Sequence, residues 1–566
     1  MTRLLHVIVL VLAACGMAVC SRGEPSKGAA SLYSPWANGP PADPSFFPLS
    51  VWWQAPTLSG RSGQYPSLAA AAAGAKINIF LGLSGESGTP GSWPERFGQD
   101  AGELEAIKAN KLYVIGGIDT PHSENSSAAS VASMLALAKS IGATSNLIGY
   151  NAGDEPNCSG QMQSVPAVVA AIGAFDPTRV VLYNHTAWMK SPQWSQCLDA
   201  SIAALKATNI GSFDLYPLTD PWLSGTPGYA GSDYASVPND SLFLQGLTTR
   251  ALVHFGRVRQ PMWVCIEAGG DNLGFAEANN RFKADVAAGS AVLVNQSGWS
   301  RFTSAWLGLT VSGAGIPAHA AIVRVLDPAH AVISAPALAT ASKVDVAVTG
   351  GAHDSDCVAS VNLCVVNGNE YRPTGAQVSA EVWMSIINGA NGVIYFCHDL
   401  DSASFCLGDQ AGGAPAAATA ANLGYINGVV LRFAPVLNAP GVGDCSMQQQ
   451  NFVTGEAWTT SSCSGGILTM ASDNASLPGM AMVKQYGGAT YVFAQSDRRS
   501  LNGASFTFRL NGLGSKTATL IYDSNERYAP AASGQGFKAT LRADGVFRDT
   551  LGAHGADYEV KVYEVR

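Results

Sequence analysis

The sequence predicts an α/β protein: a (β/α)8 TIM barrel with an inserted β module between strands seven and eight and a C-terminal antiparallel β-sandwich. Three observations lead to this prediction. Short apolar runs alternate with Ala-rich helical stretches from residue 46 to 276, a further helix and apolar run follow at 372–400, and the last part of the chain alternates with a period of two. Strands that are apolar throughout, each followed by a helix, are typical of a parallel sheet covered by helices.

Seven strands are expected before residue 276, and they are FPLSVWWQ (47–54), KINIFLGL (76–83), KLYVIGGID (111–119), NLIGYNAGDE (146–155), RVVLYNHT (179–186), GSFDLYP (211–217) and QPMWVCIEAGG (260–270). An eighth unit, RPTGAQVSAEVWMSIINGANGVIYFCHDL (372–400), reads as a helix and then a strand. Eight such units close a barrel. The alternative, an open doubly wound sheet, predicts a Gly-x-Gly-x-x-Gly turn after the first strand. The stretch VWWQAPTLSG contains no such turn.

Four regions are expected along the chain. Residues 1–22 form an export segment, and the barrel takes residues 40–276 and 371–440. Residues 277–370 carry Val, Ile and Ala runs separated by Gly and Pro, which indicates a β module. Residues 441–566 form the sandwich. Because the loops that follow the strands of a barrel form its active-site face, the module is expected to lie beside that face.

The composition favours a neutral, hydroxyl-rich partner. Only 13% of the residues are charged, and the net charge is -8 with 33 Lys and Arg. Ordinary soluble proteins have about 25% charged residues. A nucleic-acid-binding protein needs a basic patch, and no run of Lys or Arg is visible, so nucleic acid is excluded as a partner.

The N-terminus, MTRLLHVIVLVLAAC, places Arg3 before an apolar run that ends in small residues. This layout is typical of an export signal, and the run is too short to span a bilayer. We therefore expect a periplasmic, outer-membrane or extracellular protein. Residues 12–15 resemble a bacterial lipobox, in which Cys15 would carry a lipid anchor; an ordinary cleaved signal is the alternative.

Eleven cysteines also favour an oxidising compartment. Four local pairs are expected as disulfides, namely Cys158 with Cys197, Cys357 with Cys364, Cys397 with Cys406, and Cys445 with Cys463. Cys265 lies in a predicted core strand and is expected to be a packing residue. No Cys-x-x-Cys pair occurs, so no metal and no cofactor are expected.

Acidic residues stand where several predicted strands end. Asp119 follows strand three, Asp154 and Glu155 follow strand four, Asp214 lies in strand six and Glu267 ends strand seven. Catalytic groups of a barrel lie at these carboxyl ends. Alone, the Asp-Glu-Pro stretch at 154–156 also fits a helix cap, and Glu267 also fits a structural ion pair.

A barrel with one Glu after strand four and another at the end of strand seven resembles clan A of the retaining glycoside hydrolases. The order GYNAGDEP, FDLYP, VCIEAGG and RPTGAQVSAEVWMSIINGANGVIYF, followed by a small β-sandwich, resembles the β-galactosidase-like and cellulase-like members of that clan. The resemblance covers residues 46–276, 371–440 and, more loosely, 480–566. Most clan members have Asn before the strand-four acid, where this chain has Asp154, so the contact to the sugar 2-hydroxyl and the subfamily stay open.

The resemblance implies hydrolysis of a β-linked, or stereochemically equivalent, glycoside in an oligosaccharide or polysaccharide. Such an enzyme needs one carboxylate as nucleophile and one carboxylic acid as proton donor, about 5 Å apart. Glu267 would be the nucleophile, and Glu155 would be the acid/base. Asp154 would hold substrate hydroxyls or neighbouring loops, and Tyr216 would donate a hydrogen bond to Glu267.

Aromatic and polar residues near the strand ends are candidates for sugar binding, because aromatic faces stack on sugar rings. They are Trp53, Trp188, Tyr216, Asn184, His185 and His398. For any one of them a structural role is an alternative. Two further readings of the whole chain stay open: a non-catalytic glycan-binding surface protein on a degenerate barrel, and an inverting hydrolase with carboxylates about 6.5 to 9.5 Å apart. A serine hydrolase is disfavoured, because no Gly-x-Ser-x-Gly elbow occurs between a strand and a helix.

Overall fold

The computed structural model describes residues 31–52, 65–82, 101–117, 124–156, 160–186, 198–216, 242–255, 259–268, 281–296, 302, 310–327, 329–349, 363–366, 370–373, 375–396, 414–450, 457–497, 503–528, 533–534, 536–552 and 558–566. All of them belong to one compact unit, Ser31–Arg566. Within these ranges no helix combines the length and the apolar character that crossing a membrane requires.

Eight parallel strands close into a barrel, in the order β1-β2-β3-β4-β5-β6-β7-β16 and back to β1. They are β1 Leu49–Trp52, β2 Ile79–Leu81, β3 Tyr113–Gly117, β4 Leu147–Asn151, β5 Val180–Thr186, β6 Ile210–Asp214, β7 Met262–Glu267 and β16 Gly392–Phe396. Seven of the strands fall inside runs that the sequence predicted, and β6 begins one residue before its predicted run; the predicted fold class is confirmed. The parallel pairing of β16 with both β7 and β1 closes the barrel with a segment that lies more than 120 residues beyond β7.

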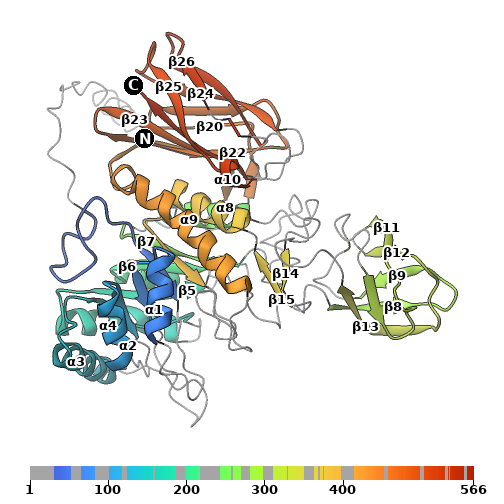
Figure 1. Ribbon diagram of the computed structural model, residues 1–566, viewed down its shortest axis with the longest axis horizontal. Coiled ribbons are helices and arrows are strands. Elements are labelled where there is room, and N and C mark those ends of the chain that lie inside the picture. Colours follow the sequence, from blue (N-terminus) through green and yellow to red (C-terminus); the bar gives the residue numbers. More distant parts are fainter. Residues whose placement is uncertain are drawn as a thin grey trace, which may run out of the picture. The chain divides into compact units, whose positions relative to one another are not determined.

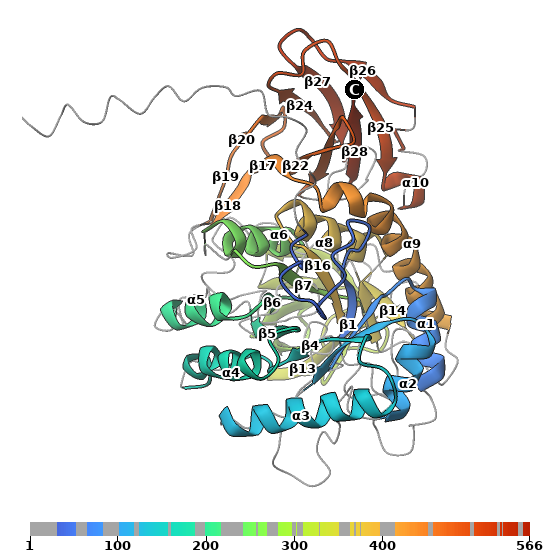
Figure 2. The same ribbon diagram turned by 90° about the vertical axis from the view of Figure 1, so that its left-hand side faces the viewer.

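Helices connect and cover the strands (Figures 1 and 2). They are α1 Tyr65–Gly74, α2 Ala101–Ala109, α3 Glu124–Ser140, α4 Gln161–Phe175, α5 Leu198–Ala207, α6 Phe243–Arg250, α8 Gly375–Ile387 and α9 Ala414–Leu437, and a π-helical turn, Ala251–Phe255, extends α6. Close packing decides one glycine of the barrel: a Cβ at Gly149 in β4 would lie 2.5 Å from Cγ2 of Val180 in β5. Only glycine therefore lets these two strands approach as they do.

The segment between β7 and α8 contains a β module with its own hydrophobic core. Its six strands pair in the order β10-β13-β8-β9-β12-β11, drawn in yellow-green in Figure 1. They are β8 Arg281–Val286, β9 Val292–Asn295, β10 Thr310–Gly313, β11 Ile322–Asp327, β12 His330–Ile333 and β13 Ala341–Thr349. Phe302 and small aliphatic side chains fill its core. A separate pair, β14 Leu363–Val366 with β15 Glu370–Pro373, precedes α8.

The C-terminal region is a sandwich of two antiparallel sheets. One sheet has the order β17-β22-β23-β28-β25-β26, and the other has the order β20-β21-β24-β27. The elements are β17 Gly441–Ser446, β20 Ser462–Gly465, β21 Leu468–Ser472, β22 Gly479–Tyr486, β23 Ala489–Ser496, β24 Ala504–Leu510, β25 Thr517–Asp523, α10 Asn525–Tyr528, β26 Lys538–Thr540, β27 Val546–Leu551 and β28 Val560–Val565. A short hairpin, β18 Gln448–Gln450 with β19 Ala457–Thr459, stands apart from both sheets.

The larger sheet of the sandwich is buried on both faces. Alternate residues of β23 belong to different cores: Val492 packs inside the sandwich, and Phe493 belongs to the core of the barrel. Trp383 of α8 stacks on Phe493 with ring centroids 5.9 Å apart. Gln495 Nε2 donates a hydrogen bond to the carbonyl of Ala380 at 3.0 Å. Barrel helix and sandwich sheet therefore share one apolar contact.

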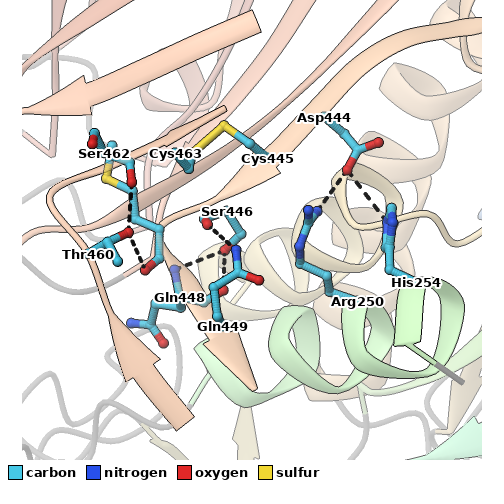
Figure 3. Close-up of a disulfide and its surroundings, with 11 residues drawn as sticks. Arg250, His254, Asp444, Cys445, Ser446, Gln448, Gln449, Thr460, Ser462 and Cys463 are labelled. Atoms are coloured by element: carbon cyan, nitrogen blue, oxygen red, sulfur yellow. Dashed lines mark hydrogen bonds and ion pairs between the residues drawn. A yellow bond between two sulfur atoms is a disulfide. The ribbon is translucent and has the colours of Figure 1, made fainter. Parts of the chain in front are cut away.

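Polar links join the same regions (Figure 3). Arg250 of α6 forms an ion pair with Asp444 of β17 at 2.8 Å, and His254 Nε2 lies 3.6 Å from the same carboxylate oxygen. Next to Asp444, the predicted disulfide Cys445–Cys463 is confirmed. The other three predicted pairs each include a cysteine outside the described residues. Cys265 is a free thiol and is completely buried, as expected of a packing residue.

Candidate active site

Four neighbouring strands, β4 to β7, carry the candidate residues to one end of the barrel. Asp154 and Glu155 follow β4, Asn184 and His185 lie in β5, Asp214 ends β6 and Glu267 ends β7. The register places Asn184 beside Ser212 and Thr186 beside Asp214. Parallel strands end at the same edge, so residues that are far apart in the sequence meet there.

A chain of hydrogen bonds links side chains of these strands next to the acids. Asn184 Nδ2 donates to Asp154 Oδ1 at 2.9 Å, and Asn184 Oδ1 accepts from the Ser212 hydroxyl at 2.7 Å. The thiol of Cys265 lies 3.7 Å from the same Asn184 oxygen. Asn184 is 1% exposed and uses both ends of its amide in this chain. It therefore orients Asp154, whose own side chain is exposed.

Glu155 meets Asp214 at the end of the strands. Glu155 is exposed, whereas Asp214 is 8% exposed and its Oδ1 atom is buried with no hydrogen-bond partner among the described residues. The Asp214 carboxyl lies within hydrogen-bonding reach of the Glu155 carboxyl. Burial, then the charge of Glu155, then that of Asp154, raise the pKa of Asp214 well above its ordinary value. Two carboxyl groups in contact do not both ionise readily, so this contact favours the protonated form of Asp214.

The backbone fixes Glu155 in an unusual conformation. Its φ angle is 38°, in the left-handed region that non-glycine residues rarely adopt. Its N–H donates to the carbonyl of Asn184 at 3.0 Å, and the N–H of Asn184 donates to the carbonyl of Gly153 at 3.1 Å. These two bonds extend the β4–β5 ladder past the end of β4. Local backbone strain of this kind is concentrated at functional sites.

His185 is completely buried, and neither of its ring nitrogens has a hydrogen-bond partner in the described part of the chain. Burial lowers its pKa to about 3, so the ring is neutral. Its nearest aromatic neighbour is Tyr183, with ring centroids 5.5 Å apart. Burial and the charge of Asp154 raise the pKa of Tyr183 to about 12. A neutral, enclosed imidazole fits a packing role better than direct contact with a sugar.

Glu267 is 0% exposed and lies against a second acid, Glu381 of α8, which is also 0% exposed. Both carboxyl oxygens of Glu381 are buried and have no hydrogen-bond partner among the described residues. Burial and the charge of Glu267 raise the pKa of Glu381 well above its ordinary value. The contact therefore favours the protonated form of Glu381. Sequence reasoning missed it, although a lone acid in the otherwise apolar helix sequence VSAEVWMSII was a usable signal.

Two aromatic rings flank the end of β7. Tyr216 follows β6 and Phe396 ends β16, and these strands lie on either side of β7. The rings stack with centroids 5.0 Å apart and an interplanar angle of 20°. Phe396 is the register partner of Glu267. The stack therefore offers an aromatic surface next to the predicted nucleophile.

The structure brings together Asp154, Glu155, Asn184 and Asp214, and it gives Glu267 a different acidic neighbour. Trp53, Trp188 and His398 lie outside the described residues. Three residues that the sequence did not assign to the site also take part. Ser212 and Cys265 contact the side chain of Asn184, and Asp214 pairs with Glu155. Within the described ranges, no group of three or more His, Cys, Asp or Glu side chains is arranged to hold a metal ion.

No family model matches the chain, and no curated protein matches it either. Remote similarity to solved structures exists. A structure described as "Glycoside hydrolase" is 10% identical, with 94% of this chain and 98% of that chain covered and a TM-score of 0.42. A glycoside hydrolase family 5 protein from Bacteroides vulgatus is 11% identical, with 92% and 89% covered and a TM-score of 0.42. An Anoxybacillus α-amylase is 7% identical, with 92% and 98% covered and a TM-score of 0.42. With similarity this remote, the fold assignment depends on the strand pairing described above.

Proposed function

We propose that the protein is a glycoside hydrolase that cleaves a β-linked, or stereochemically equivalent, glycosidic bond by double displacement. Glu155 acts as the acid/base and Glu267 as the nucleophile. The observation that carries this proposal is the position of these two acids, after β4 and at the end of β7 of a closed eight-stranded barrel. Active sites of such barrels lie at this end of the strands.

The surroundings of Glu155 support its role as proton donor. It is exposed, its backbone is fixed by Asn184, and its carboxyl group contacts a buried acid. In the first step Glu155 gives a proton to the leaving oxygen while Glu267 attacks the anomeric carbon. In the second step Glu155 takes a proton from water, and water replaces Glu267 on that carbon.

The substrate side of the proposal is an oligosaccharide or polysaccharide. Asp154, held by Asn184, would accept hydrogen bonds from sugar hydroxyls. The stacked rings of Tyr216 and Phe396 offer an apolar face of the kind on which sugar rings pack. The proposal includes export of the protein, either as a protein with a cleaved signal or with a lipid anchor at Cys15. The Cys445–Cys463 disulfide fits an oxidising compartment.

One observation favours a second candidate, a non-catalytic glycan-binding protein on the same barrel. Glu267 is completely enclosed, and the acid Glu381 lies against its carboxyl group. A nucleophile must be ionised and must reach the sugar, and a fully buried site beside a second acid favours neither. In this second reading the strand-end acids bind hydroxyls without turnover.

The test is hydrolysis of a panel of aryl glycosides by the full chain, followed by single substitutions. We expect Glu155→Gln and Glu267→Gln each to lower kcat by about 100-fold or more with an unchanged melting temperature. The control is Glu105→Gln, an exposed acid on α2, which should keep wild-type activity. Binding of glycans without turnover by the wild type would support the second candidate instead.

The mechanism has its own measurement. A 2-deoxy-2-fluoro glycoside slows the second step, so a covalent adduct should accumulate and appear by intact mass spectrometry on the peptide that contains Glu267. A product of inverted configuration and no adduct would indicate the inverting reading and overturn the nucleophile assignment.

A further inference from the structure

The contact between Asp214 and Glu155 joins two strands that are not neighbours. β5 lies between β4 and β6 in the barrel, so the two carboxyl groups meet across the end of β5. One is exposed and the other is 8% exposed with an unpartnered buried oxygen in the described part of the chain. The buried Asp214 therefore meets an exposed acid at this contact.

We propose that Asp214 stores the proton that Glu155 delivers, and that Asp214 is therefore a positioning residue for the acid/base. This inference rests on the proposed function. The pair holds one proton, which rests on Asp214 and moves along the contact to Glu155 as Glu155 protonates the glycosidic oxygen, so that both carboxyl groups are ionised in the glycosyl-enzyme intermediate. When Glu155 later takes a proton from water, the proton returns to Asp214. One proton leaves the pair in the first step and one enters in the second, so the pair ends as it began.

Charge around the pair explains why it keeps a proton at neutral pH. The titratable groups that face Asp214 are Glu155 and Asp154 from the end of β4 and Cys265 from β7. None of these groups is cationic, and His185 on the neighbouring strand is buried and neutral. A negative charge on Asp214 would face the carboxyl groups of Glu155 and Asp154, and none of the groups named here is a base that could compensate it, so the singly protonated pair is favoured.

The strained backbone at Glu155 supports the same assignment. The left-handed φ of 38° is a conformation that residues with a side chain rarely adopt. The two backbone hydrogen bonds with Asn184 hold this conformation in place. The strained residue is thus the one whose carboxyl group contacts Asp214.

The experiment compares Asp214→Asn with wild type in the full chain, using the aryl glycoside that the wild type hydrolyses best. Asn keeps the size and polarity of the side chain but carries no exchangeable acid proton. With Asn at position 214, the contact no longer holds an acid that keeps its proton at neutral pH. We therefore expect the basic limb of the kcat/KM profile to move by about one pH unit or more toward acid, with KM little changed.

The matched control is Asp176→Asn. Asp176 is a buried acid before β5, at the opposite end of the barrel, where it accepts hydrogen bonds from Tyr150 and Arg179. Its substitution should lower the melting temperature and leave the pH profile in place. An Asp214→Asn protein that is folded and keeps the wild-type profile would overturn the inference. Absence of hydrolysis by the wild type would instead overturn the proposed function.

A second measurement does not need activity. Infrared difference spectra of wild type against Glu155→Gln and against Asp214→Asn, recorded from pH 5 to pH 9, report which carboxyl groups are protonated. We expect a protonated carboxyl signal at pH 7 that disappears in Asp214→Asn. Two fully ionised carboxylates at pH 7 in the wild type would contradict a stored proton, even if Asp214→Asn proves unstable.

Discussion

Glu381 of α8 lies against Glu267 at the end of β7, and both side chains are completely buried. The pair resembles the contact of Asp214 with Glu155 in one respect: each predicted catalytic acid has a second acid beside it, from a different element of the barrel. Burial and the neighbouring acid raise the pKa of Asp214 in one pair and of Glu381 in the other. Each contact therefore favours the protonated form of its buried acid.

The variant Glu381→Gln tests the pair formed by Glu381 and Glu267. In the folded state the pKa of Glu381 is raised, so the folded protein holds a proton that the unfolded chain releases above about pH 4.3. Stability is therefore lost as pH rises above that value. Gln has no proton to hold and can donate an amide hydrogen bond to Glu267. We expect its melting temperature to exceed that of wild type at pH 8 by several degrees, with a much smaller difference at pH 5.

Thermal unfolding at the two pH values checks this prediction. Glu105→Gln, an exposed substitution, should give the same small difference at both. A Glu381→Gln protein that is equally destabilised at pH 5 and pH 8 would show that the carboxyl group is ionised and needed.

Asn184→Ala tests whether the amide holds Asp154 in place. The substitution removes the donor to Asp154 and leaves the buried Ser212 hydroxyl without its acceptor. We expect a stability loss of about 1 to 3 kcal/mol together with a rise in KM for the glycoside of several-fold. Denaturant unfolding and steady-state kinetics measure the two effects.

Asn209→Ala is the matched control. Asn209 lies just before β6, and its side-chain oxygen accepts a hydrogen bond from the N–H of Val181 in β5. It should lose comparable stability and keep the wild-type KM. If both variants change stability alone, Asn184 is a structural residue only.

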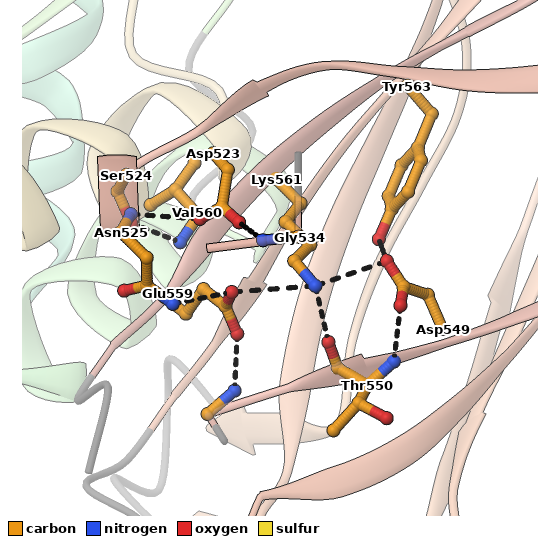
Figure 4. Close-up of polar contacts among 11 residues, drawn as sticks. Asp523, Ser524, Asn525, Gly534, Asp549, Thr550, Glu559, Val560, Lys561 and Tyr563 are labelled. Atoms are coloured by element: carbon orange, nitrogen blue, oxygen red, sulfur yellow. Dashed lines mark hydrogen bonds and ion pairs between the residues drawn. The ribbon is translucent and has the colours of Figure 1, made fainter. Parts of the chain in front are cut away.

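A buried charged group in the sandwich is open to a separate test (Figure 4). Lys561 is 4% exposed, and its Nζ lies 3.1 Å from Asp549 Oδ2 and 3.5 Å from Glu559 Oε1. Burial by itself lowers the pKa of Lys561, but the nearby carboxylates of Glu559, Asp549 and Asp523 reverse this effect and raise it. The lysine therefore stays charged and neutralises part of the acidic cluster.

Lys561→Met leaves these acids without their cation. We expect a loss of about 3 to 5 kcal/mol in the free energy of unfolding, because an uncompensated buried charge is costly. Lys516→Met, an exposed position before β25, should change stability by no more than about 0.5 kcal/mol. Urea unfolding of the three proteins decides the point, and equal midpoints would mean that the cluster is neutralised by protons instead.

Much of the fold could be predicted from the sequence because apolar runs and helical segments carry their own periodicity. The eight barrel strands, the β module between β7 and β16 and the period of two in the C-terminal strands were all legible in this way. The start of α9 at Ala414 was not legible in this way. Its first turns are Ala-rich and have no apolar stripe, so periodicity could not mark their start.

The sequence by itself determined which acids stand at strand ends, because a strand that runs out in Asp154 and Glu155, Asp214 or Glu267 is a local feature. Only the tertiary structure decided their partners. Barrel closure brings β4 within reach of β6 across β5, and the packing of α8 brings Glu381 to Glu267 from more than 100 residues away. Such contacts depend on side-chain positions in three dimensions, which hydrophobic periodicity does not encode.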